Sequence, residues 1–427
     1  MAFPLGMVGV ILGYVLLDGL GIGLQYAWNA GLQLTVAVIL GTVAWWRRRR
    51  SAEEFTMAVN GGWRELAPWA QWLVAGLLGW MILRWLGIVV EVMHRPLFPW
   101  DAWYAYGAQA KVWFFAEKLG VFANGSAWFA SDEPAWSVGG VRHPPGIGLI
   151  QLWMVQSLGR WDDALMNLPW PLVFAGLGVA FVGLARIAGV SLLVSVVCLW
   201  LVMSLPVLDI QAVLAGYGDL WIAVYLFLAT CGLMLLRREG DKGLIAVIAA
   251  AVAGLLLIKE VGAFWLCPVV LGLLAGWLTI FRLLLTGVVV VAIGVAGLWW
   301  LGEPVKIGIL GEFGFADGVP VFPGYVPMWG ALATHLFVLP NWHLFWCLVA
   351  LSLPAVWIAC RRNHSLRVPV FTGLGGVIAL FGIYAFSDLG HSVIDGTSVN
   401  RLLLHPVPVL GLMLALVAEN WRQRHFP

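Results

Sequence analysis

Long apolar stretches without alternation make up most of this chain, and short polar or basic segments separate them. A helix that crosses a bilayer needs roughly 17–25 mainly apolar residues, and the stretches have this length. Strands would alternate polar and apolar positions, so the pattern predicts helices. The predicted spans, about twelve, are residues 4–24, 30–46, 67–93, 163–185, 190–207, 219–236, 243–258, 261–277, 283–301, 341–360, 368–386 and 402–419.

One further apolar segment, residues 146–158, is too short to be a typical span. We expect it to be an interfacial helix that lies along the membrane surface. If it crossed the membrane, every later basic cluster would move to the opposite side. The distribution of basic residues therefore favours twelve spans and one surface helix.

Composition supports a membrane protein. Hydrophobic residues make up 62% of the 427 residues and charged residues 11%, whereas a soluble domain has about 25% charged residues. Because backbone polar groups in a bilayer must be paired within the protein, the apolar runs are expected to be helical. The sequence thus predicts an all-α integral membrane protein. Its net charge of +2 is too small to indicate nucleic acid as a partner.

The basic clusters predict the orientation, because Lys and Arg collect on the cytoplasmic side of membrane proteins. Arg47–Arg50 follow the second span, and Arg361 and Arg362 follow the span 341–360. Both termini are then cytoplasmic, in a bacterial inner membrane. The predicted parts are two N-terminal helices (1–50), a cytoplasmic linker (51–66), a membrane module (67–301) with a first periplasmic loop (94–162), a second periplasmic loop (302–340) and C-terminal helices (341–427).

The first outer loop carries the most polar chemistry. Asp101 lies in the motif PWDAW, where it is either a helix N-cap or a general base that removes a proton from an acceptor hydroxyl. Arg142 and His143 lie in RHPPG and are candidates for binding a phosphate or lipid headgroups. Lys111 is more typical of an interfacial lysine that snorkels to the membrane surface. We expect the same of Arg84, within an apolar run.

Three later motifs carry further ionisable groups. Asp219 in GYGDLW begins a span, and an acid at a membrane boundary is either functional or a helix cap. Lys259 and Glu260 end an apolar run, so they form either a mutual ion pair or a binding site for an anionic carrier. Arg401 precedes the last span, where it binds phosphate or anchors the helix.

The predicted topology places all of these groups on the outer face. We therefore expect Asp101, Asp219, Lys259 and Arg401 to converge in one extracytoplasmic cavity. The sequence has no Walker loop, no dinucleotide-binding glycine motif and no His and Cys spacing typical of zinc sites.

The order of these motifs carries a family resemblance. An outer loop with WDAW and a later A-K is followed by HPP, GY-x-D, K-E-x-G and R-L-L-L-x-P. This series resembles the GT-C class of polytopic glycosyltransferases, in particular bacterial members of the protein O-mannosyltransferase and lipid A aminoarabinose transferase superfamily. The resemblance covers roughly residues 67–420.

The resemblance implies transfer of a sugar from a polyprenyl-phosphate-linked donor to an acceptor hydroxyl of a glycan, lipid or protein on the periplasmic face, with inversion. It implies that Asp101 is the catalytic residue. The implied substrate-binding residues are Lys111, Arg142, His143, Asp219, Lys259, Glu260 and Arg401. Ala102 follows Asp101, where some relatives have a second acid, so a metal-bridged site is not favoured, because hard cations need several oxygen ligands.

Two other classes remain open. A lipid or glycan transporter or flippase would place ionisable groups near the middle of the bilayer and have two related halves; here these groups lie mostly at span ends, and no halves are visible. An O-antigen ligase or polymerase would have its chemistry in a large late loop. The loop 302–339 keeps that reading open, since it contains Lys306, Glu312, Asp317 and His335.

Overall fold

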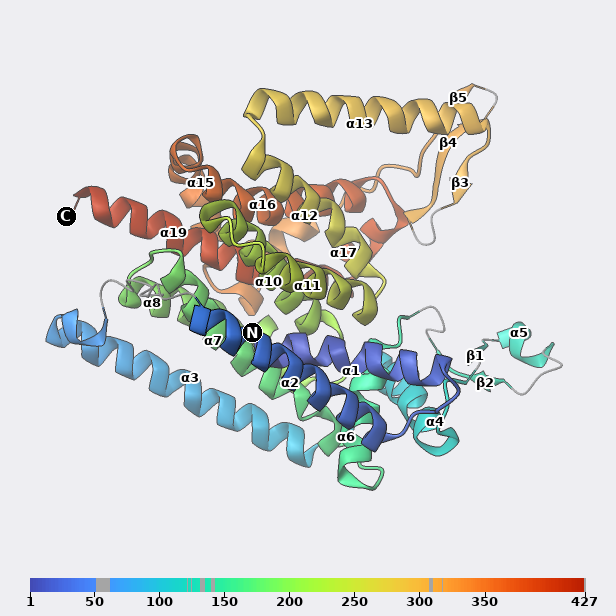
Figure 1. Ribbon diagram of the computed structural model, residues 1–427. Helices are drawn as coiled ribbons and strands as arrows, with labels where there is room; N and C mark the ends of the chain where they lie inside the picture. The colour runs from blue at the N-terminus through green and yellow to red at the C-terminus, as the bar shows by residue number, and fades with distance from the viewer. Residues whose placement is uncertain are drawn as a thin grey trace.

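The computed structural model describes residues 1–50, 62–120, 122–123, 125–130, 135–139, 143–306, 310–316 and 318–425. This part of the chain is mostly helical (Figure 1). By length and composition, eight of its helices are able to cross a membrane, or nine if one bent pair counts as a span. The eight lie in α1 (Ala2–Gly19), α2 (Tyr26–Arg50), α3 (Pro68–His94), the segment Leu165–Ile187 with η3 (Leu165–Asn167) and α7 (Pro169–Ile187), α10 (Asp219–Glu239), α13 (Ile280–Leu301), α15 (Phe345–Arg362) and α16 (His364–Ala385). The predicted helical membrane protein agrees with this finding.

The other four predicted spans are also helical, but they are short or broken. The run 190–207 falls on α8 (Leu192–Met203) and α9 (Pro206–Val213), which are bent by 65°. α11 (Leu244–Ile258) and α12 (Val261–Trp277) have 15 and 17 residues. The last run is divided between α18 (Val399–Leu404) and α19 (Val407–His425). Proline begins α9 and follows α18, and proline interrupts helical hydrogen bonding. The described helices thus support eight or nine spans, where the sequence predicts twelve.

α6 (Gly146–Leu158) differs from the predicted surface helix. Every residue from Gly146 to Leu152 is buried, and the helix packs against α1 and α4 (Ala108–Ala116). A Cβ atom at Gly146 would lie 2.3 Å from the carbonyl oxygen of Leu257, so glycine allows α6 to begin directly against the end of α11. The polar side chains of α6, Gln151 and Gln156, hydrogen-bond to Asn167 and to the carbonyl oxygen of Leu24 within the protein, which is typical of a buried helix rather than an interfacial one.

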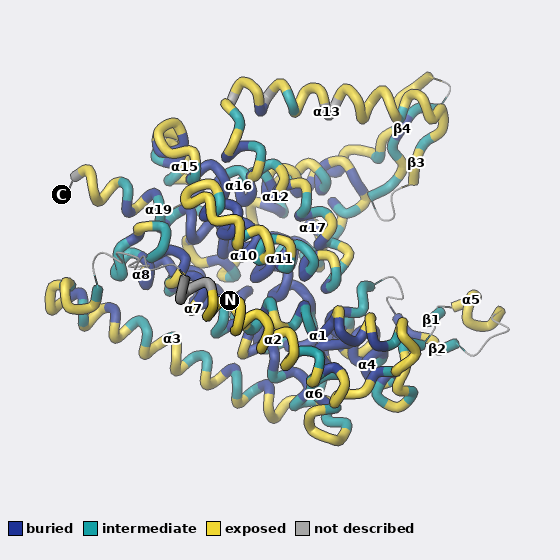
Figure 2. Tube along the Cα trace, viewed as in Figure 1, coloured by how far each residue is buried: buried dark blue, intermediate teal, exposed yellow. Residues whose placement is uncertain are grey.

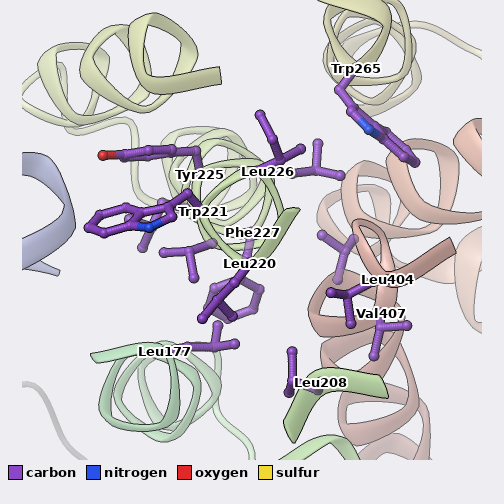
Figure 3. Close-up of a cluster of buried hydrophobic side chains, with 14 of the residues drawn as sticks. Leu177, Leu208, Leu220, Trp221, Tyr225, Leu226, Phe227, Trp265, Leu404 and Val407 are labelled. Carbon is purple, nitrogen blue, oxygen red and sulfur yellow. The ribbon is translucent and has the colours of Figure 1, made fainter. Parts of the chain in front are cut away.

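The core surrounds α10, whose first 17 residues, Asp219–Leu235, are all buried. Trp221 and Tyr225 of this helix contact Phe3 and Pro4 of α1, and Phe227 stacks on Phe181 of α7. Trp265 of α12, Leu404 and Val407 lie on the other side of α10 from Trp221 and Tyr225 (Figure 3). The outer helices α3 and α13 instead expose most of their apolar side chains (Figure 2). Exposed apolar surface of this extent is rare on a monomeric soluble protein, and it fits helices that face lipid.

The two long loops carry short strands, which the all-α prediction did not include. β1 (Phe122–Ala123) pairs with β2 (Trp136–Ser137). β3 (Val305–Lys306), β4 (Glu312–Ala316) and β5 (Val319–Val321) form an antiparallel sheet. Both groups of strands project from the same side of the bundle, opposite the C-terminus (Figure 1). The remaining short helical elements are η1 (Trp63–Glu65), η2 (Ala102–Gly107), α5 (Gly125–Phe129), α14 (Trp329–Ala333), η5 (Thr334–Val338), η6 (Pro340–Trp342), η7 (Asp388–Gly390) and α17 (His391–Ile394).

Candidate functional site

A fully buried acid, Asp219, lies at the start of α10 and accepts hydrogen bonds from three side chains. Lys259 Nζ lies 3.0 Å from Oδ1 and 3.3 Å from Oδ2. Arg401 Nε lies 3.0 Å from Oδ2, and His405 Nε2 lies 3.1 Å from Oδ1. The side chain of Asp219 is 0% exposed, so its carboxylate is enclosed behind the two cations that it binds. The substrate-binding role that the resemblance implied for Asp219 stays a prediction.

The orientation of His405 follows from its second ring nitrogen. Trp265 Nε1, on α12, lies 2.8 Å from His405 Nδ1. An indole N–H can only donate, so Nδ1 must accept, and the proton of the neutral ring is on Nε2. Nε2 therefore donates to Asp219. The sequence analysis assigned no role to His405 or to Trp265.

Arg401 connects the buried acid to the partly exposed Asp101. Its Nη1 lies 2.9 Å from Asp101 Oδ2, and its guanidinium carbon lies 4.4 Å from the ring centre of Tyr217. Burial alone would lower the pKa of Arg401, but the carboxylates of Asp219 and Asp101 outweigh this effect and raise the pKa. The predicted convergence of Asp101, Asp219, Lys259 and Arg401 is thus confirmed, while the catalytic and binding roles stay predictions.

The contacts of Asp101 do not support the N-cap interpretation, and the general-base interpretation stays a prediction. Its carboxylate makes no capping hydrogen bond, although it lies directly before η2, which is a π-helix. Single π-helical turns occur frequently at functional sites. Gly216, with a φ of +101°, packs against this turn, because a Cβ there would lie 2.7 Å from that of Ala102. The GYGD turn thereby closes on the residues next to Asp101.

Lys259 and Glu260 do not form the mutual ion pair that was one of the alternatives. Lys259 has an extended backbone (φ −160°, ψ 150°) at the break between α11 and α12, so the two neighbouring side chains point to different partners. Glu260 Oε2 lies 2.6 Å from Nδ1 of His143. Burial would raise the pKa of Glu260, but the hydrogen bond with His143, a backbone hydrogen bond and the charge of Lys259 together outweigh this effect, and the pKa is lowered.

His143 also stacks on the ring of Tyr106, with ring centres 5.1 Å apart. Tyr106 is 1% exposed, and its hydroxyl has no hydrogen-bond partner among the described residues. A buried polar group without a partner is uncommon in folded proteins. No sequence signal indicated this hydroxyl as part of the site.

Two predicted binding residues are not in this cluster. Lys111 on α4 lies over the ring of Trp161, 5.7 Å from its centre, and within the described part of the chain it forms no hydrogen bond or ion pair with Asp219 or its partners. The π-helical turn η2 lies between Asp101 and Lys111 and changes the direction in which Lys111 points relative to Asp101. Arg142 lies outside the described residues.

Arg84 is not the isolated snorkelling residue that the sequence suggested. It forms an ion pair with Asp209 on α9 and lies over the ring of Trp80, 4.7 Å from its centre. In the second loop, Lys306 and Glu312 are opposite each other in the β3–β4 pair, and His335 lies in η5. Asp317 is outside the described residues. Lys306, Glu312 and His335, which the structure does describe, make no contacts comparable to those around Asp219.

Among the described residues, no group of three or more His, Cys, Asp or Glu side chains is arranged to hold a metal ion. Comparisons with protein-family models, with curated proteins and with solved structures find no match for this chain.

Proposed function

We propose that this protein is a membrane glycosyltransferase of the GT-C type, which transfers a sugar from a polyprenyl-phosphate-linked donor to an acceptor hydroxyl. One observation carries the proposal. A partly exposed carboxylate, Asp101, lies against Arg401, and the buried Asp219 behind them fixes Arg401 and Lys259 together. A carboxylate and two oriented cations at one end of an apolar helical bundle suit the transfer of a sugar away from a phosphate.

The two cations are the proposed phosphate-binding groups. An ammonium has three donors and a guanidinium five, and Asp219 and Asp101 leave some of these N–H groups available. Charge-assisted hydrogen bonds to phosphate oxygens are among the strongest that proteins make. As the bond from the anomeric carbon to the carrier oxygen breaks, Lys259 and Arg401 stabilise the negative charge that develops on the departing phosphate.

Asp101 is the proposed general base. It removes the proton of the acceptor hydroxyl while the acceptor oxygen attacks the anomeric carbon, and the bonding electron pair leaves with the polyprenyl phosphate. A single displacement of this kind inverts the anomeric centre. In the structure Oδ2 of Asp101 is paired with Arg401. A donor phosphate would compete for this guanidinium, so donor binding would release the base for the reaction.

Tyr106 and His143 are proposed to complete the site. Tyr106 is buried, and its ring stacks on the imidazole of His143, so its proposed role is to position His143. His143 and Glu260 have side chains 24% and 46% exposed, so they lie closer to the surface, where they would contact sugar or acceptor hydroxyls. The reaction as proposed requires no metal or other cofactor.

We infer that this site faces the periplasm of a bacterial inner membrane, with twelve spans and cytoplasmic termini. α10 has 21 residues and is therefore about 30 Å long, close to the thickness of a bilayer core. Asp219 begins this helix, and Arg237 and Arg238 are near its other end. Since basic residues favour the cytoplasmic side, the Asp219 end is assigned to the outer face.

A flippase or transporter is the second candidate. An apolar cavity of about 1270 Å³ lies between α13 and the helices α12 and α16, lined among others by Leu283, Trp299 and Phe371. A cavity of this kind suits the hydrocarbon chain of a carrier lipid in either class of protein. An O-antigen ligase or polymerase is less favoured, because the ionisable residues Lys306, Glu312 and His335 of the second loop, which the structure describes, do not converge on one site.

The test is the variant Asp101→Asn, with Asp395→Asn as the matched control. Asp395 is an exposed acid whose carboxylate bonds to Thr397. Loss of a general base typically lowers the rate about 10²–10⁴-fold, so we expect this loss for Asp101→Asn and none for the control. Transfer of labelled sugar from a polyprenyl-phosphate donor is measured with purified protein in liposomes. Near-normal transfer by folded Asp101→Asn would refute the proposal, and donor translocation without sugar transfer by the unaltered protein would favour a flippase.

A further inference from the structure

A second polar cavity lies at the opposite end of α10 from the Asp219 site. It has a volume of about 430 Å³, and its lining comes from four helices, α10, α15, α16 and α19, and from the turn between α7 and α8. Three arginines, Arg238, Arg362 and Arg424, line it. Because Arg238 is near the C-terminal end of α10, about 30 Å of helix separates this cavity from Asp219. It is therefore a separate site.

The charges of this arginine pocket are not balanced by the acids around it. Arg238 Nη1 donates to the carbonyl oxygen of Ile187 at 3.0 Å, which leaves its positive charge unpaired. Among the described residues, no carboxylate lies within ion-pair distance of Arg362 or Arg424. The pocket thus has three cationic side chains in a space of limited volume.

The one acid in the lining, Glu419, already has its own partners. Its oxygens accept from Arg422 Nη2 at 2.7 Å, from Gln423 Nε2 at 3.0 Å and from the backbone N–H of Ser191 at 3.1 Å. Glu419 therefore caps the start of α8 and pairs with an arginine outside the lining. It does not neutralise the arginines within the pocket.

We propose that the arginine pocket binds a phosphate-bearing anion. Arginine presents a planar fork of N–H groups that matches phosphate oxygens. Basic pockets between membrane helices near the cytoplasmic face are suited to the headgroups of anionic lipids, and the positive-inside rule assigns this end of the bundle to the cytoplasm. The phosphate belongs either to such a headgroup or to a free phosphate compound. This inference is independent of the proposed glycosyl transfer.

The experiment measures retention of phosphatidylglycerol and phosphatidylcholine by the purified full chain, using native mass spectrometry in a neutral detergent. We expect the unaltered protein to retain one phosphatidylglycerol in preference to phosphatidylcholine. The variant Arg362→Gln with Arg424→Gln should reduce this retention about tenfold, since charge-assisted bonds to the phosphate are lost. The control removes the same charge at Arg361 and Arg282, which do not line the pocket, and should change retention less than about twofold.

A second arm distinguishes the two sources of phosphate. Inorganic phosphate and pyrophosphate are titrated against the thermal stability of the same proteins. A saturable stabilisation that the pocket variant loses would identify a free phosphate compound, and its absence together with selective lipid retention would identify a headgroup. Equal effects in the pocket and control variants would overturn the proposal. If the pocket variant does not fold, the test rests on the unaltered protein. The proposal is then overturned if that protein shows neither a preference for phosphatidylglycerol nor stabilisation by phosphate or pyrophosphate.

Discussion

Among the single residues of the candidate site, Asp219 and Asp101 differ in environment although both are acids bound to Arg401. Asp219 is enclosed, and its two oxygens serve Lys259, Arg401 and His405. Asp101 is 36% exposed and is bound through one oxygen. A buried acid that neutralises buried cations contributes to stability, whereas a partly exposed acid is free to react. The two positions should therefore respond differently to the same substitution.

We expect Asp219→Asn to destabilise the protein by roughly 3–5 kcal/mol, because removal of one member of a buried ion cluster leaves the others uncompensated. Transfer activity should be lost as well, since Lys259 and Arg401 lose their common anchor. Asp101→Asn should abolish transfer with little effect on stability. Thermal or denaturant unfolding in detergent measures the difference. If Asp219→Asn unfolds like the unaltered protein, Asp219 does not hold this cluster together.

Local sequence identified the ionisable residues of the site but not their partners. Asp101, Asp219, Lys259 and Arg401 were candidates because each lies at the end of an apolar run. Their pairing depends on how distant helices meet, as the separate partners of the adjacent Lys259 and Glu260 show. Trp265, Tyr106 and Asp209 were missed for the same reason, because an aromatic or acidic residue within an apolar run does not reveal what it faces.

At the scale of elements, a helix break and two close backbone contacts position the site. The break at Lys259 separates α11 from α12, and Gly262 makes it possible, because a Cβ there would lie 1.8 Å from the carbonyl oxygen of Leu255. Gly146 allows α6 to meet the end of α11. The contact at Gly262 orients Lys259 and Glu260. The contact at Gly146 brings the start of α6, with His143 just before it, to the same end of α11.

Gly262→Ala should therefore destabilise the protein by about 2–3 kcal/mol, the upper range for a single substitution, and lower transfer activity. The clash is with backbone, which cannot move aside as a flexible side chain would. Gly183→Ala in α7 is the control, because a Cβ there meets nothing within 4 Å, and alanine in a helix should stabilise by about 0.5–1 kcal/mol. Unfolding and sugar transfer are measured for both variants. Equal stability of the two would show that the break tolerates a side chain.

The same breaks explain why the number of spans was harder to predict than their existence. Each predicted run is helical, but apolar composition does not show where a helix stops or bends inside the run. The 65° bend between α8 and α9 and the division between α18 and α19 both occur at prolines, whereas the division between α11 and α12 occurs at Lys259. α6 was placed on the surface because its length excluded a span, and length alone cannot separate a buried short helix from an interfacial one.

For the whole molecule, the proposed activity depends on which side of the membrane each end of the bundle faces. The strand-bearing loops project from one side and the C-terminus from the other (Figure 1). Ser137 in β2 and Arg361 at the end of α15 are both exposed, and they mark the two sides. Single cysteines at these positions, in a chain whose five native cysteines are replaced, report the orientation.

In intact cells with a permeabilised outer membrane, a maleimide that cannot cross the inner membrane should label Ser137→Cys and leave Arg361→Cys unlabelled. After the inner membrane is disrupted, both should react. The reason is that the arginine-rich ends of α10 and α15 favour the cytoplasm, which leaves the β1–β2 segment and the Asp219 site on the other side. Labelling in the reverse order would place Asp101 in the cytoplasm and exclude transfer on the periplasmic face, whatever chemistry the residues of the site can perform.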